Sequence, residues 1–262
     1  MASILYFSHG GGPLPILGDP GHDAMVAFMR GLPDRFPKPK AIVVASAHWE
    51  EPEAAVTSAS NPSLVYDYFG FPREAYSLAY PSPGSPALAD RVASLLGKAG
   101  ITCRKDPRRG FDHGHFIPLL LMYPQADIPS IQISLRRGLD PRVHLEMGEA
   151  LRPLGKENIL FIGSGFSFHN MGAFSWSGPP PSDPRNGAFQ DWLTETCAGD
   201  LDYPAVRARL VEWERAPNDR YCHPREEHLL PLHLCAGLAG GAGEKVFDDF
   251  ILGKRAVAFL WR

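Results

Sequence analysis

The sequence Ala-Ile-Val-Val-Ala-Ser-Ala-His at residues 41–48 is an apolar, β-branched run that leads directly into a histidine. A continuous run of this kind is typical of a strand that is buried on both faces, as in a parallel sheet covered by helices. Two other stretches share the pattern: residues 4–8 end at His9, and residues 159–168 reach His169 through Gly-Ser-Gly. The pattern predicts an α/β fold in which three strands each lead into a histidine.

These three histidines indicate a metal or catalytic site at one edge of the predicted sheet. In open α/β sheets, ligands bind beyond the carboxyl ends of the strands, and histidine is the commonest side-chain metal ligand. We therefore expect His9, His48 and His169 to meet at that edge. The alternative is three separate hydrogen-bonded histidines, each at the end of its own strand.

The remaining pattern predicts one α/β domain, residues 1–262, with a central mixed sheet flanked by helices and the metal site at the carboxyl edge of the strands. Further strands are expected at residues 53–58 and 128–135, with a closing hairpin at 245–250 and 255–261. Helices are expected at residues 21–32, 85–97, 116–123, 141–154, 187–215 in two pieces, and 225–238. Residues 61–84 are interpreted as an ordered aromatic loop, and the Pro- and Gly-rich residues 171–186 as a surface loop suited to act as a lid.

Composition and charge narrow the classes of partner. The 262 residues include 26 basic and 29 acidic side chains, a formal net charge of −3, which predicts no binding of nucleic acid or of an anionic membrane surface. No apolar run approaches the ~20 residues that a membrane-spanning helix needs, and the first residues do not resemble a signal peptide. The four cysteines form no Cys-x-x-Cys pair. We therefore expect free thiols and a cytoplasmic protein.

One further histidine is a candidate from the last part of the chain. His223, His228 and His233 are five residues apart, which on a helix is a rotation of about 140°, so at most one of them faces a site from that helix. His228 is the best candidate, because acidic residues 226–227 precede it and an apolar run follows.

A last candidate lies in the sequence Asp-His-Gly-His at residues 112–115. If this segment is extended, His113 and His115 point to opposite sides, so one of them can enter a cleft while the other packs or meets solvent. Asp112 and Gly114 favour a sharp turn before the predicted helix at 116–123. The other histidines, His22, His144 and His233, carry no feature that distinguishes them from surface or hydrogen-bonded core residues.

At these residues the chain resembles the class III extradiol ring-cleaving dioxygenases, the LigB-type superfamily, and in particular their small members of the DOPA 4,5-dioxygenase type. The resemblance rests on short segments in a fixed order, and residues 172–222 show little of it. The segments are residues 8–10, 46–50, 66–72, 80–86, 110–119, 122–129, 163–170 and 223–232.

The resemblance implies a role for each of the five candidate histidines. His9, His48 and His228 would be the metal ligands, and His169 would lie beside the metal as an acid/base residue or an occasional fourth ligand. His113 would be the second acid/base residue. Because the wider superfamily often uses two histidines and a glutamate, Glu226 or Glu227 remains an alternative to His228.

The activity implied by the resemblance is that of a non-haem Fe(II)-dependent extradiol dioxygenase. Such an enzyme inserts both atoms of O₂ into a small catechol, a DOPA-like or related aromatic diol, and opens the ring. Zn(II) is also possible as the bound metal, since the Irving–Williams order does not favour Fe²⁺. Two alternatives remain at this point: a zinc-dependent hydrolase, which uses the same ligand set, and a non-enzymatic metal-binding interaction protein of the same fold.

Overall fold

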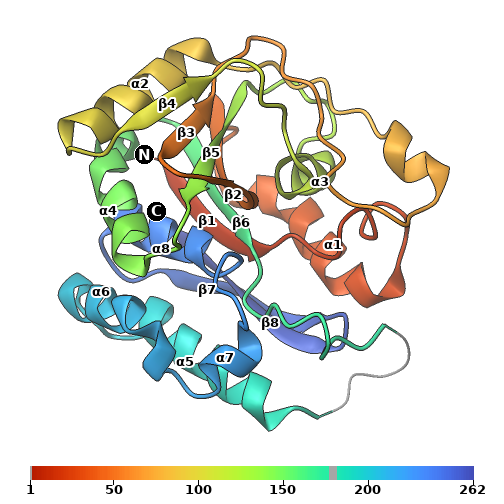
Figure 1. Ribbon diagram of the computed structural model, residues 1–262. Coiled ribbons are helices and arrows are strands. Elements are labelled where there is room, and N and C mark those ends of the chain that lie inside the picture. Colours follow the sequence, from red (N-terminus) through yellow and green to blue (C-terminus); the bar gives the residue numbers. More distant parts are fainter. Residues whose placement is uncertain (1, 177–181) are drawn as a thin grey trace.

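The strands of the chain form one mixed sheet in the computed structural model, which describes residues 2–176 and 182–262 (Figure 1). The strands are β1 (Ser3–Ser8), β2 (Ala41–Glu51), β3 (Ala54–Thr57), β4 (Cys103–Asp106), β5 (Ser130–Arg136), β6 (Ile159–Gly165), β7 (Glu244–Ile251) and β8 (Lys254–Trp261). Their order across the sheet is β4-β3-β5-β2-β6-β1-β8-β7. The predicted α/β class with a mixed sheet is confirmed.

Parallel pairing brings the carboxyl ends of three strands to the same edge. β6 lies between β1 and β2 and is parallel to both. Ser8 of β1 is paired with Gly165, and Ser46 of β2 is paired with Ser164. His9 and His48 follow these serines by one and two residues, so the register itself places both histidines at one end of the sheet.

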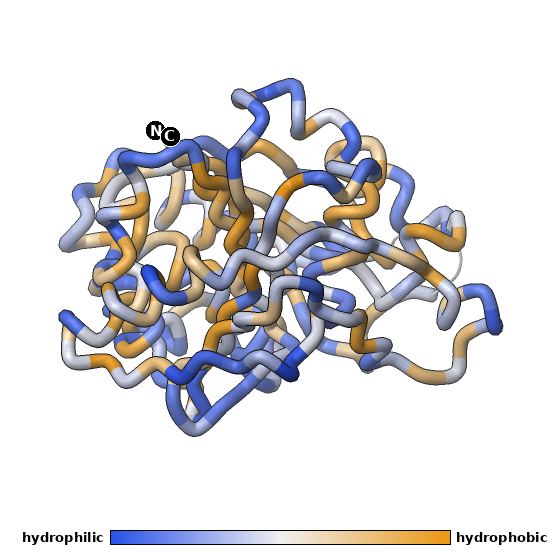
Figure 2. Tube along the Cα trace, turned by 90° about the horizontal axis from the view of Figure 1, so that it is seen from above, coloured by the Kyte–Doolittle hydropathy of each residue, from blue (hydrophilic) through white to orange (hydrophobic). Residues whose placement is uncertain are grey.

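Helices cover both faces of this sheet. They are α1 (Asp23–Gly31), α2 (Pro86–Lys98), α3 (His113–Met122), α4 (Pro141–Leu151), α5 (Pro184–Ala198), α6 (Tyr203–Val211), α7 (Asp219–Cys222) and α8 (Leu230–Ala239). Short 3₁₀ turns occupy Pro20–His22, Leu32–Arg35, Arg73–Ser77, Arg152–Lys156 and Trp213–Arg215. Figure 1 shows α4 and α8 on one side of the sheet and α1 and α3 on the other. The hydrophobic segments gather toward the middle of the molecule, with hydrophilic ones mostly at its periphery (Figure 2).

Two helices begin at residues other than those predicted from the sequence. The helix predicted at 225–238 begins only at Leu230, with Pro231 in its first turn, where proline's fixed φ and missing N–H are tolerated. His228 therefore lies in the turn before α8. The helix predicted at 116–123 begins at His113, so the expected sharp turn before it is wrong. His113 and His115 still point apart, because two residues span about 200° on a helix.

The strands also differ in detail from the prediction. β2 continues through His48 to Glu51, with an irregular register between Ala45 and Glu50. The short strand β4 was not predicted, since its sequence Cys-Arg-Lys-Asp carries no apolar pattern. The predicted loop at 171–186 ends at α5, and its residues 177–181 lie outside the described residues. The four cysteines are free, as expected. Among the described residues, none of the helices is both long and apolar enough to cross a membrane.

Candidate metal centre

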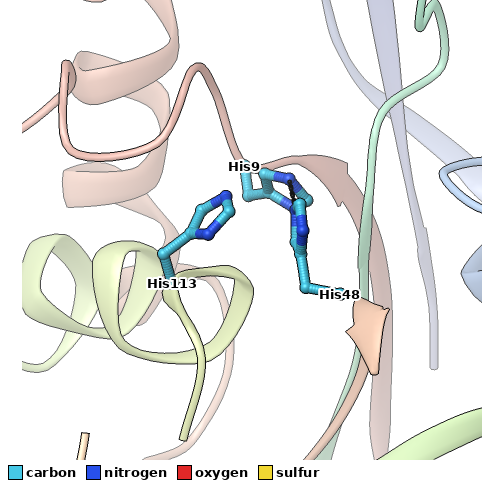
Figure 3. A group of neighbouring side chains, drawn as sticks. All are labelled: His9, His48 and His113. Carbon is cyan, nitrogen blue, oxygen red and sulfur yellow. Dashed lines mark hydrogen bonds between the residues drawn. The ribbon is translucent and has the colours of Figure 1, made fainter. Parts of the chain in front are cut away.

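All five candidate histidines line one cavity of about 510 Å³. They come from five parts of the chain. His9 directly follows β1, His48 lies near the end of β2, His113 is the first residue of α3, His169 follows β6, and His228 precedes α8. Figure 3 shows the rings of His9, His48 and His113 approaching one another from three separate elements. The expected meeting of His9, His48 and His169 is therefore observed.

The Nε2 atoms of two histidines, His9 and His228, converge on the Nε2 of His48. The Nε2 of His9 lies 3.0 Å from that of His48, and the Nε2 of His228 lies 3.3 Å from it. Two nitrogens bound about 2.1 Å from one ion, at octahedral to tetrahedral angles, are themselves ~3.0–3.4 Å apart. Each of these two spacings fits a pair of nitrogens bound to one metal ion.

The Nδ1 atoms of the same three histidines face partners that accept a proton, and these partners set the tautomer that a metal ligand requires. The hydroxyl of Ser164 donates to the carbonyl of Gly114, so its oxygen accepts the Nδ1–H of His9 at 3.0 Å. The Nδ1 of His228 lies 2.8 Å from the Glu227 carboxylate, and the Nδ1 of His48 lies 3.5 Å from that of Asp67. With the protons on Nδ1, each Nε2 presents a lone pair, as metal-binding histidines do.

The protonation states favour the same role. Burial is the main cause that lowers the pKa of His9, His48 and His228 well below 6.5, and repulsion between the clustered rings lowers it further. These imidazoles are therefore neutral at neutral pH, and neutral imidazole is the form that binds Fe(II) or Zn(II).

His113 is a geometric alternative to His228 as the third ligand. The ring nitrogens of His9, His48 and His113 form a group within 4.8 Å of one another. The ring centroids of His113 and His48 are 3.9 Å apart at a tilt of 47°. His113 thus lies over the ring of His48, whereas His9 and His228 meet His48 nitrogen to nitrogen.

Asp67 is the functional candidate that sequence reasoning missed. Its Oδ1 lies 2.8 Å from the Nδ1 of His113 and accepts the backbone N–H of the same residue at 3.0 Å. Burial raises the pKa of Asp67, but the hydrogen bonds and charge of His113 outweigh it and hold that pKa at about 2. The carboxylate is therefore ionised and orients two histidines. It is the single acidic residue of 61–72, a signal that could have identified it.

Glu227 contacts the Nδ1 atoms of two of the histidines, His228 and His169. Its Oε1 lies 2.8 Å from the Nδ1 of His228 and 3.1 Å from that of His169. Burial raises the pKa of Glu227, but the hydrogen bond from His169 outweighs it, and the pKa is lowered. Glu226 is turned instead to Arg220, at 2.6 Å. This arrangement favours Glu227 as a carboxylate that orients His228 and His169.

We expect Glu227→Gln to weaken metal binding by roughly 10–100-fold, because loss of a carboxylate partner leaves a ligand histidine less basic and less firmly oriented. A chelator competition titration with Zn(II) measures the affinity. Glu226→Gln is the matched control and should leave it unchanged. Equal affinity for the unaltered protein and Glu227→Gln would contradict the assigned role.

The backbone of His228 is held by the end of β6. The carbonyl of His228 accepts the N–H of Phe166 at 3.0 Å and the hydroxyl of Tyr6 at 3.2 Å. A Cβ at Gly165 would lie 2.1 Å from the same carbonyl oxygen. The absence of a side chain at Gly165 therefore allows His228 to approach the strand.

We expect Gly165→Ala to displace His228, to lower metal affinity and to cost about 1–3 kcal/mol of unfolding free energy, the usual range for overpacking. Denaturant unfolding and metal titration measure the two effects. Gly187→Ala is the control: it lies in α5 with nothing within 4 Å of the added Cβ, and should be neutral or stabilising by up to ~1 kcal/mol. Similar unfolding curves and metal affinities for the two variants would refute the expected displacement.

Comparisons with known proteins agree with the fold and with the chemistry of the cavity. Residues 22–254 match the family model described as the catalytic LigB subunit of aromatic ring-opening dioxygenase. The chain is 39% identical to the dioxygenase tasH of Hapsidospora irregularis, over 100% of this chain and 86% of that protein. It is 43% identical to the 4,5-DOPA dioxygenase extradiol of Beta vulgaris, over 78% of this chain and 74% of that protein. The crystal structure of an uncharacterized protein from Escherichia coli K12 matches with a TM-score of 0.81 and 30% identity, over 99% of each chain.

Proposed function

Because this chain belongs to the family of LigB-type aromatic ring-opening dioxygenases and is an extradiol ring-cleaving dioxygenase, we propose that it opens the ring of a small catechol with Fe(II) as its active metal. DOPA-like and related aromatic diols form the candidate substrate class, since several relatives are named 4,5-DOPA dioxygenases. We further propose that residues 1–262 act as one catalytic domain. A cytoplasmic location is favoured by the free thiols.

The convergence of the Nε2 atoms of His9, His48 and His228, at 3.0 and 3.3 Å, carries this proposal. These three residues would hold the metal at the carboxyl edge of the strands. A ligand set of three neutral imidazoles leaves Fe(II) with open positions at which a catecholate and O₂ can be brought together.

The two remaining histidines are placed to move protons. The Nδ1–H of His113 is held by Asp67, so its Nε2 is the acceptor that we assign to a catechol hydroxyl proton. The Nδ1 of His169 faces Glu227, and we assign to His169 the return of a proton to an oxygen of the product. Histidine is the side chain most often used for proton transfer in enzymes and can act as either acid or base.

The two alternative functions that the sequence left open fit less well than ring cleavage. A zinc hydrolase would use the same ligand set, but the relatives and the family model are dioxygenases. The same finding disfavours a non-enzymatic interaction protein.

An oxygen-electrode assay tests the proposal. Protein reconstituted with Fe(II) under argon is given a panel of catechols, DOPA included, and then O₂. We expect consumption of O₂ in step with the catechol and formation of a yellow ring-opened product. Protein loaded with Zn(II) is the control and should consume no O₂. The proposal is wrong if the iron protein, kept reduced, consumes O₂ with none of the catechols.

A further inference from the structure

Large apolar side chains make up part of the lining of the cavity that holds the five histidines. They are Leu14, Phe69, Phe71, Met171, Phe174 and Trp176. At the rim, Phe69 is 89% exposed, Met171 57% and Trp176 52%. Large apolar side chains gathered in the open around a cavity mark a surface that binds an apolar group.

The phenol of Tyr68, which lines the cavity, is already engaged, because its hydroxyl donates to the carbonyl of Ala75 at 2.5 Å. A polar substituent on a bound ring would therefore find this hydroxyl occupied.

The charged side chains in and around the cavity disfavour the binding of an anionic group. Among the described residues that line it, Asp67 carries the one carboxylate, and none is a lysine or arginine. Three cations outside the lining contact carboxylates: Arg225 contacts Glu50 at 2.6 Å, Lys254 contacts Asp183 at 2.5 Å, and Arg109 contacts Asp112 at 3.0 Å.

We propose that the enzyme selects catechols whose ring substituent is apolar and uncharged, and that it discriminates against substituents that carry a carboxylate, the amino acid DOPA included. The inference rests on the proposed function and narrows its substrate class. A cavity of about 510 Å³ lies within the range of roughly 300–1,000 Å³ typical of small-ligand sites, which leaves room for a substituent beside the diol ring. A carboxylate there would lose its hydration, and the described residues of the lining include no lysine or arginine that could replace it.

A matched substrate series tests this selection. The series is 4-methylcatechol, 4-propylcatechol, 3-(3,4-dihydroxyphenyl)propanoate, DOPA and dopamine, with the Fe(II) enzyme. We expect kcat/KM to rise about tenfold for each added methylene, as in other apolar pockets. The kcat/KM values for the propanoate and for DOPA should be at least roughly tenfold below the value for 4-propylcatechol, a difference of ~1.4 kcal/mol. A propanoate or DOPA used as well as 4-propylcatechol overturns the proposal. So does a preference for dopamine, since Asp67 would then be recruiting an ammonium group.

Binding separates this inference from the proposed function. Affinities of the same series for the Zn(II) protein, measured by calorimetry, require no turnover. If no catechol is cleaved but 4-propylcatechol still binds at least roughly tenfold more tightly than the propanoate, the proposed function fails and the selection is supported. If catechols are cleaved but the two bind equally well, the selection fails and the function stands.

A charge introduced at the rim gives a second test. We expect Met171→Arg to shift the ratio of kcat/KM for the propanoate over 4-propylcatechol by at least roughly tenfold toward the propanoate. Phe250→Arg is the matched control, because Phe250 is also an exposed apolar residue, 46% accessible, and lies outside the cavity lining. An unchanged ratio in Met171→Arg, or the same shift in both variants, contradicts the proposal.

Discussion

His48→Ala is expected to abolish metal binding and, with it, ring cleavage. The Nε2 of His48 lies 3.0 Å from that of His9 and 3.3 Å from that of His228, so its removal opens the centre of the nitrogen cluster. The loss of metal affinity should exceed the roughly 10–100-fold loss that follows removal of a residue that only hydrogen-bonds to a ligand histidine. Metal content after reconstitution with Fe(II) or Zn(II), and a chelator competition titration, measure it.

The control for His48→Ala is His233→Gln. His233 is also buried, but its ring nitrogens face the carbonyls of Leu210 and Leu229, outside the cavity. We expect this variant to lose stability and to keep its metal. Circular dichroism of His48→Ala should show a folded protein, because the imidazole that is removed is neutral and Asp67 keeps its hydrogen bonds to His113. A folded His48→Ala that retains full metal content would refute the assigned centre.

The same measurement identifies the third ligand. His228→Ala should lose the metal, whereas His113→Ala should retain it. The reverse result would assign the third position to His113, which has a ring nitrogen within 4.8 Å of those of His9 and His48. Retention in both variants would point to Glu227, whose carboxylate contacts His228 and His169.

How far the sequence predicts this site depends on what fixes each residue. His9 and His48 could be located because buried strands have a strong apolar pattern and parallel pairing brings their ends together. His228 lies in a turn, where periodicity gives no signal; the change from acidic to apolar residues made it a candidate, and only the resemblance to a family gave it the role of a ligand. The helix expected around it was misplaced because the apolar run was read without weighing Pro231, which marks the first turn of α8.

Asp67 could not be assigned from the sequence for a different reason. It lies in an irregular aromatic loop and reaches His113 across 46 residues of chain. A contact of this kind depends on tertiary packing, which local patterns do not encode. The resemblance included the segment around Asp67 without giving the carboxylate a role, and its function as an orienting group emerges from the hydrogen bonds to His113.

The largest effects on turnover without loss of metal are expected from His113→Ala and His169→Ala. Each should lower kcat by ~10²–10⁴-fold, the usual contribution of a general acid or base. Both histidines are held by carboxylates, at 2.8 Å from Asp67 and 3.1 Å from Glu227, and neither is among the three whose Nε2 atoms meet. Steady-state O₂ consumption measures kcat, and metal analysis of the same samples shows whether the site is intact.

A substrate that needs no base separates the two proton transfers. 4-Nitrocatechol loses its first proton in neutral solution, so His113→Ala should approach the unaltered enzyme with this substrate while remaining slow with 4-methylcatechol. His169→Ala should be equally impaired with both, because protonation of the product is still required. Rescue of both variants would mean that both histidines act in deprotonation. Rescue of neither would mean that His113 positions the substrate through its contact with Asp67, since a lost hydrogen bond is not replaced by a more acidic catechol.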